Sequence, residues 1–201
     1  MIRVLLAEDQ AMVRGALSAL LTLEEDIKIV SEVARADQII ESALATNPDI
    51  ALLDIEMPGG DGLTEGANLK KAIPDCKIII LTTFGRPGYL QRAMESGISG
   101  FLVKDTPASE LAIAIRRVMA GERVIDPEQA IAALSLGQSP LTDRECAVLK
   151  AAADGSSNEQ IARSLHLSEG TVRNYLSAAI QKLDAHNRSE AVRMAEQKGW
   201  L

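Results

Sequence analysis

Short apolar runs alternate with longer amphipathic segments along the first 120 residues of the chain. Each run is as long as a strand and is closed by acidic residues, Pro or Gly, which favours buried strands of a parallel sheet. In the segments between the runs, apolar residues recur at helical spacing. Strands are therefore expected at 2–7, 27–33, 50–53, 77–81 and 100–103, and helices at 10–23, 36–46, 62–72, 87–96 and 108–120. Five strand–helix units with right-handed crossovers predict an α/β fold with a five-stranded, doubly wound parallel sheet of the flavodoxin-like kind.

The pattern changes after residue 120. Residues 121–138 indicate a connector with one short helix, because Asp126-Pro127 is a typical helix start and residues 137–140 break the chain. From residue 139 onward only helical patterns are visible, and later helices are expected at 158–165, 169–183 and 189–198. Capping boxes open the first two helices of this region, at Thr142…Glu145 and Ser157…Gln160. We therefore expect a small all-α domain at 139–201, after a first domain at 1–120.

The composition favours globular domains in a reducing compartment. Apolar residues make up 47% of the chain and aromatic residues 2%, so aliphatic side chains must fill the cores. No apolar run approaches the ~18 residues of a membrane span, and the opening segment is a strand cut off by acids rather than a signal peptide. Cys76 and Cys146 have no CxxC partner, which favours buried free thiols. These features predict a cytoplasmic protein without a membrane anchor.

Charge is distributed unevenly between the two predicted domains. Residues 1–138 carry 13 Lys and Arg against 20 Asp and Glu, a net charge of −7, whereas residues 139–201 carry 8 of each. The acidic part disfavours contact with nucleic acid. The neutral part could bind it if its few cations are clustered.

Polar side chains follow four of the predicted strands at the point where each strand ends. Asp54 follows the third strand, and Glu8-Asp9, Thr82 and Lys104 follow the first, fourth and fifth. Alone, each has an ordinary explanation: an Asp can cap a helix, a Thr can sit in a strand, and a Lys can be solvated. Because the carboxyl ends of parallel strands meet at one edge of a sheet, we expect these side chains to converge.

Such a cluster suits phosphate and metal chemistry. Carboxylates packed together repel one another without a cation, and Mg²⁺ prefers hard oxygen ligands. Lys104 could hold a phosphoryl oxygen as a point charge, and the Thr82 hydroxyl could donate to it. Asp54 then fits as the nucleophile of an in-line phosphoryl transfer.

Residues 1 to about 120 resemble the receiver domain of response regulators. The matching segments are AEDQ at 7–10, DIEMPGGDG at 54–62, LTT at 81–83 and FLVKD at 101–105. The resemblance implies that Asp54 accepts phosphate from a sensor histidine kinase, and that Thr82, Lys104 and Phe101 form the switch. It also implies that Glu8, Asp9, Asp54 and the backbone carbonyl of Glu56 hold Mg²⁺. Asp105 follows Lys104 where many receivers have Pro, which leaves the isomer of that peptide bond open.

The helix expected at 169–183 has the pattern of a reading helix. It follows a scaffold helix and a short turn, as in a helix-turn-helix, whose second helix enters the major groove. Arg173 can bond a guanine and Asn174 an adenine. The alternative is a plain helical bundle with solvated side chains, which the neutral charge of this region favours.

Residues 139–201 resemble the LuxR-type DNA-binding domain of the NarL/FixJ family. The matching segments are LTDRE, ADGSSNEQIA, LSEGTVRNYL and KLDAHNRSEA. The resemblance implies base contacts from Arg173, Asn174 and Ser177, and phosphate contacts from Thr171 and Lys182. Many relatives have Lys and His at the positions of Arg173 and Tyr175, so the target preference stays open. A narrower similarity, to DesR-type regulators of membrane-lipid desaturation, is carried by residues 82–89, 170–175 and 197–200.

These observations favour a two-component transcription regulator whose DNA affinity rises on phosphorylation of Asp54. Sensor kinase, operator DNA and RNA polymerase are its candidate partners. One alternative is a phosphate-independent regulator with a vestigial receiver, which the complete set of site residues disfavours. The other is an enzyme, a haloacid-dehalogenase-like phosphatase with Asp54 as its nucleophile. Such an enzyme needs a second acid two residues after the nucleophile, and Glu56 matches this requirement only in part.

The helices at 10–23 and 108–120 carry more apolar residues than one sheet-covering stripe requires. The extra Ala residues could simply favour helix. We expect instead that the two helices form the face of a homodimer that assembles on phosphorylation over a near-palindromic operator; the surface of the fourth helix and fifth strand is the alternative. The residues expected on this face are Leu17, Leu20, Ile113 and Val118.

Overall fold

The computed structural model describes residues 1–83, 85–136 and 139–201. Phe84, within the motif at 82–89, and residues 137–138 of the predicted chain break lie outside the described residues. The chain divides into two compact units, residues 1–85 with 90–131 and residues 86–89 with 132–201. None of the described helices is both long enough and apolar enough to cross a membrane.

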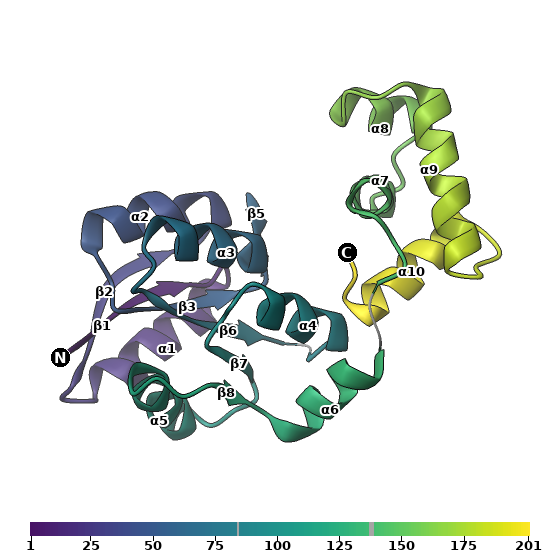
Figure 1. Ribbon diagram of the computed structural model, residues 1–201. Coiled ribbons are helices and arrows are strands. Elements are labelled where there is room, and N and C mark those ends of the chain that lie inside the picture. Colours follow the sequence, from purple (N-terminus) through teal and green to yellow (C-terminus); the bar gives the residue numbers. More distant parts are fainter. Residues whose placement is uncertain (84, 137–138) are drawn as a thin grey trace. The chain divides into compact units, whose positions relative to one another are not determined.

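The first unit contains a parallel sheet whose strands follow the order β2-β1-β3-β6-β7-β8 (Figure 1). Its central strand, β3, is buried at all five positions, which explains its continuous apolar sequence. The main strands lie where the apolar runs predict them, so the doubly wound α/β fold is confirmed. The strands are β1 (Ile2–Ala7), β2 (Ile27–Val33), β3 (Ile50–Asp54), β6 (Lys77–Thr82), β7 (Gly100–Val103) and β8 (Val124–Ile125).

The sheet has six strands where the sequence predicts five. The additional strand β8 lies in the predicted connector and pairs with β7, with Val124 opposite Gly100 and Ile125 opposite Phe101. A run of two residues is too short to show a strand period, so the apolar pattern could not reveal it. The loop after β3 also folds back on itself as a small antiparallel pair, β4 (Glu56–Met57) and β5 (Gly60–Asp61).

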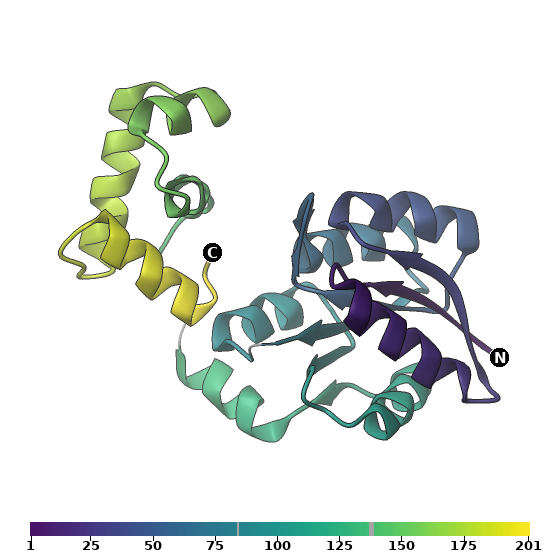
Figure 2. The same cartoon turned by 180° about the vertical axis from the view of Figure 1, so that it is seen from behind.

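Helices cover both faces of the sheet (Figures 1 and 2). Helices α1 and α5 pack against each other on one face, and α2 and α3 pack together on the other. Aliphatic side chains of α1, α5 and the strands form the core between them. The segment expected as one helix at 36–46 begins with a 3₁₀ turn at Ala36–Gln38. The helices of this unit are α1 (Ala11–Thr22), α2 (Ile39–Thr46), α3 (Gly62–Ala72) and α5 (Ala108–Met119), with α4 (Pro87–Glu95) and α6 (Pro127–Leu136) reaching the division between the units.

The second unit is helical and has its own aliphatic core. Both predicted capping boxes are present, with the Thr142 and Ser157 hydroxyls each accepting from the backbone amide three residues later. The turns on either side of α9 hold His166 and Asp184 in the left-handed region, at φ 54° and 52°. The helices are α7 (Asp143–Ala153), α8 (Asn158–Ser164), α9 (Glu169–Lys182) and α10 (Arg188–Lys198).

Candidate functional site

The carboxyl edge of the sheet brings the predicted side chains together. The Lys104 ammonium lies 2.6 Å from a carboxylate oxygen of Glu8 and 3.0 Å from Oδ2 of Asp54. Glu8, Asp54 and Thr82 are buried. The cluster thus combines two buried carboxyl groups and a cation within contact distance, which confirms that these strand ends converge.

Burial and charge act in opposite directions on this cluster. Burial raises the pKa of Asp54, while the neighbouring Lys104 opposes this increase. For Lys104, burial acts to lower the pKa, but its contacts with the Glu8 and Asp54 carboxylates outweigh burial and raise it. Lys104 therefore stays a cation beside the carboxyl group of Asp54.

A close backbone approach shapes the turn around Asp54. The Ile55 amide donates to Oδ1 of Asp54 at 2.8 Å, which fixes the carboxylate. Gly62 lies so near this turn that a Cβ atom there would stand 1.8 Å from the Asp54 carbonyl oxygen. Only glycine fits at that position, so the last Gly of the DIEMPGGDG motif is required because a side chain would collide with the backbone of Asp54.

The acidic side chains fit a divalent cation. Glu8, Asp9 and Asp54 each offer a carboxylate oxygen, and these atoms lie within 4.8 Å of one another. Oδ1 of Asp9 is buried and has no hydrogen-bond donor among the described residues. Buried polar atoms are normally satisfied, so this oxygen suits a ligand. Hard oxygen donors of this kind suit Mg²⁺.

A polar cavity of about 150 Å³ lies beside the cluster. This volume exceeds the ≈ 30 Å³ of a single water several-fold, so the cavity has room for more than one small ligand group. Gln10 and Thr83 also line it, although the sequence pattern did not single them out. The lining residues are Asp9, Gln10, Asp54, Glu56, Thr82 and Thr83.

The remaining predicted switch residue, Phe101, is 1% exposed and belongs to the interior of the sheet. Its role in a switch stays a prediction. The peptide bond between Lys104 and Asp105 is trans. The isomer that the sequence left open is therefore the ordinary one.

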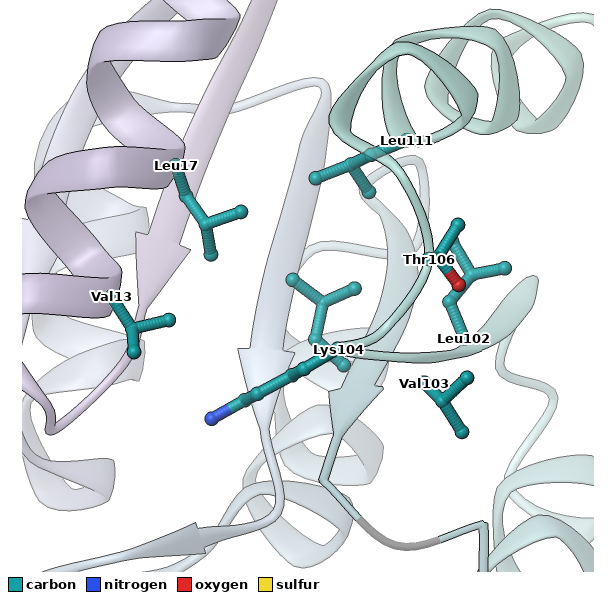
Figure 3. A pocket seen from close by; sticks show the side chains of 8 residues that line it. Val13, Leu17, Leu102, Val103, Lys104, Thr106 and Leu111 are labelled. Carbon is teal, nitrogen blue, oxygen red and sulfur yellow. The ribbon is translucent and has the colours of Figure 1, made fainter.

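The expected dimer face is only partly at the surface. Leu20 and Ile113 are 44% and 52% exposed, whereas Val118 is fully buried against the sheet. Including Val118 was wrong, because the apolar residues of α5 face two directions and Val118 lies on the inner one. Leu17 is half-buried and points, with Val13 and Leu111, into a small apolar cavity of about 40 Å³ that the stem of Lys104 also lines (Figure 3).

Helix α9 presents polar side chains on its outer face. Arg173, Asn174 and Ser177 are exposed, at spacings that place them on neighbouring positions of one face. The Ser168 hydroxyl caps the helix by accepting from the Thr171 amide at 3.1 Å, and it also contacts the Thr171 hydroxyl. The start of the helix is therefore capped, and the side chains of its polar face are exposed.

Lys182 lies at the other end of α9 and is committed to its own domain. Its ammonium donates to Oε2 of Glu145 at 2.7 Å, and the same oxygen accepts from the Thr142 amide. Burial acts to raise the pKa of Glu145, but the contact with Lys182 and the hydrogen bonds from Thr142 together lower it. Lys182 therefore links α9 to α7 by an ion pair. Its contact with a DNA phosphate stays a prediction.

Comparison with known families identifies both units. Residues 4–116 match the response regulator receiver domain, and residues 139–195 match the bacterial regulatory proteins of the luxR family. The chain belongs to the response regulators. It is a two-component response regulator that joins a receiver to a LuxR-type DNA-binding domain, as the sequence motifs predict.

Full-length relatives support this assignment. The response regulator is 46% identical to the transcriptional regulatory protein DesR of Bacillus subtilis, and 45% identical to YvfU of the same organism, over all of both chains. Among solved structures, it resembles the response regulator ChrA of a heme-sensing two-component system, with a TM-score of 0.58, 33% identity and coverage of 100% and 98% of the two chains. A response regulator RcsB solved in complex with DNA has a TM-score of 0.64 at 25% identity, covering 98% of each chain.

Proposed function

We propose that a sensor histidine kinase phosphorylates this response regulator on Asp54 and that the phosphorylated form binds operator DNA with higher affinity. The observation that carries the proposal is the Lys104 ammonium held between Glu8 and Asp54 beside a polar cavity. A carboxylate oxygen of Asp54 attacks the phosphorus of the phosphohistidine, and the bond between that phosphorus and the histidine nitrogen breaks. Lys104 then pairs with the oxygens of the transferred group.

Glu8, Asp9, Asp54 and the backbone carbonyl of Glu56 are the proposed Mg²⁺ ligands. When bound there, the ion supplies charge stabilisation to the transferring phosphoryl group. A haloacid-dehalogenase-like phosphatase would leave the helical unit, which matches the luxR family of regulatory proteins, unexplained. A regulator whose Asp54 holds its phosphate is therefore preferred to an enzyme.

An exposed apolar stripe on α1 supports a homodimer. Met12, Ala16 and Leu20 on α1 and Leu23 just after it follow one another at spacings of three and four residues and are all exposed. Ile113 is an exposed apolar residue of α5. Phosphorylation adds about −1.5 to −2 charges, which should draw Lys104 and Thr82 toward Asp54 and favour the pairing-competent state.

A two-fold dimer explains how a neutral domain could bind DNA. It would place two copies of α9 about one DNA turn apart, on a near-palindromic site. Arg173, Asn174 and Ser177 are the proposed base contacts, and the Thr171 hydroxyl is a proposed phosphate contact. The DNA-bound structure of the related RcsB supports this use of the domain.

Footprinting tests the whole proposal. DNA fragments selected from a random pool are incubated with the protein, with and without a small phosphodonor and Mg²⁺. We expect protection at a lower protein concentration when the donor is present, because phosphorylation favours the dimer. Equal protection with and without the donor would instead support a vestigial receiver.

Replacing Leu20 by Asp should block the dimer. The charge would lie in the middle of the α1 stripe, and sedimentation of the beryllofluoride-bound protein should show a monomer where wild type shows a dimer. Leu17 is a poorer probe because it also packs on the core. Leu44→Asp on α2, where Leu44 is 61% exposed, is the matched control. If Leu20→Asp dimerises like wild type, the surface of α4 and β7 becomes the better candidate.

A further inference from the structure

Helix α1 begins with an unusual charge arrangement. Its first turn has no acidic residue, and the Gln10 side chain does not cap it. A cation, Arg14, instead lies close to the helix start, where the helix dipole disfavours positive charge. The side chain of Arg14 is only 22% exposed, so it is not simply a solvated residue. Some contact must compensate for this placement.

Arg14 contacts the backbone of the acidic edge, by which we mean the carboxyl end of the sheet that carries Glu8, Asp9 and Asp54. Its Nη1 atom donates to the backbone carbonyl of Glu8 at 2.6 Å and lies 3.4 Å from that of Asp9. Its Nε atom lies 3.8 Å from a carboxylate oxygen of Glu32 on β2, and the other oxygen of Glu32 accepts from Ser18 at 2.7 Å. The short bond to the Glu8 carbonyl is directional, because the guanidinium donors form a planar fork, and the Glu32 carboxylate adds a weaker ion-pair contact.

This support acts on the peptide that joins two proposed metal ligands. The Glu8 amide donates to the Val33 carbonyl at 3.0 Å, and the Glu8 carbonyl accepts from Arg14. Both backbone groups of Glu8 are therefore held by hydrogen bonds. Holding this carbonyl sets the plane of the Glu8–Asp9 peptide bond. That plane determines where the Asp9 side chain leaves the backbone, and Asp9 carries the buried oxygen without a donor.

We propose that Arg14 is a positioning residue for the metal-binding edge, which it ties to α1 and, through Glu32, to β2. It contacts neither the metal nor the phosphoryl group. The inference rests on the proposed function of the acidic edge. Supports behind metal ligands commonly contribute 10–100-fold to metal affinity. Because Arg14 lies on α1, binding of Mg²⁺ at the acidic edge would also affect the position of that helix, which carries the exposed apolar stripe.

The test compares Mg²⁺ binding by full-length variants, measured by calorimetry. Arg14→Gln should raise the dissociation constant about tenfold, and Arg14→Lys, which keeps a charged donor group, should recover part of the loss. Labelling of Asp54 by a small phosphodonor should show a higher Mg²⁺ midpoint but nearly the wild-type rate at saturating Mg²⁺. Asp54→Asn establishes that the measured binding occurs at this site.

Arg116→Gln is the matched control. Arg116 donates to Asp26 at 2.6 and 2.9 Å and to Glu24 at 2.6 Å, at the far end of α1. Its loss removes more ion-pair contacts than the loss of Arg14 but leaves the acidic edge intact, so thermal stability should fall with unchanged Mg²⁺ affinity.

Three results would overturn the role of Arg14. The first is wild-type Mg²⁺ affinity in Arg14→Gln, and the second is equal weakening in Arg14→Gln and Arg116→Gln. The third is a rate that stays low at saturating Mg²⁺, which would make Arg14 part of the chemistry. If wild type itself neither binds Mg²⁺ nor is labelled, the proposed function fails together with this inference.

Discussion

Replacing Asp54 by Asn is expected to abolish labelling of the protein by a small phosphodonor in the presence of Mg²⁺. Asparagine keeps the shape of the side chain but removes the nucleophilic carboxylate and one proposed metal ligand. Intact-mass spectrometry should show one added phosphoryl group on wild type and none on Asp54→Asn. The loss should be complete, because among the described side chains only Asp54 combines a 3.0 Å contact with Lys104 and a hydrogen bond to the buried Ile55 amide.

Asp49→Asn is the control for this experiment. Asp49 precedes the same strand, β3, and accepts from the Arg3 amide at the opposite edge of the sheet. Its loss should leave labelling unchanged. A variant lacking the Asp54 carboxylate that still gains a phosphoryl group at the wild-type rate would show that the phosphoacceptor lies elsewhere.

Replacing Arg173 by Ala should weaken binding to the preferred operator by about 1–3 kcal/mol and relax discrimination at one base position. The reason is that a bidentate contact to guanine carries sequence information, whereas a contact to phosphate does not. Titration of the best selected site and of single-base variants at fixed salt measures both effects.

Arg193→Ala on α10 removes the same charge from the same domain and serves as the control. Arg193 is exposed and lies 3.8 Å from Glu190. An equal loss on every sequence in Arg173→Ala would identify Arg173 as a phosphate contact. No loss at all would move the reading surface away from the start of α9.

The sequence predicts those parts of the fold that depend on local pattern. Strand β3 is recognisable because both its faces are buried, and α7 and α8 are recognisable because each begins with a capping box. Strand β8 escapes prediction because two residues have no period. It is defined by its pairing with β7, which the local sequence does not reveal.

The site is predictable for a different reason. Parallel strands bring their carboxyl ends to one edge of the sheet. The positions where the strands end are therefore enough to predict that Glu8, Asp54 and Lys104 lie close together. Partners distant in sequence follow no such rule. The contact of Lys182 with Glu145 spans 37 residues, and the inward direction of Val118 depends on the rotation of α5 against the sheet. Both require the tertiary structure.

The two turns that bound α9 each place a residue with a side chain in the left-handed region of the backbone. His166 and Asp184 occupy a backbone region that costs a residue with a side chain about 1–3 kcal/mol. Glycine would avoid that cost, although its greater freedom in the unfolded chain would cancel part of the gain. Stabilising substitutions therefore remain accessible on both sides of the reading helix, as is common where natural selection requires only sufficient stability.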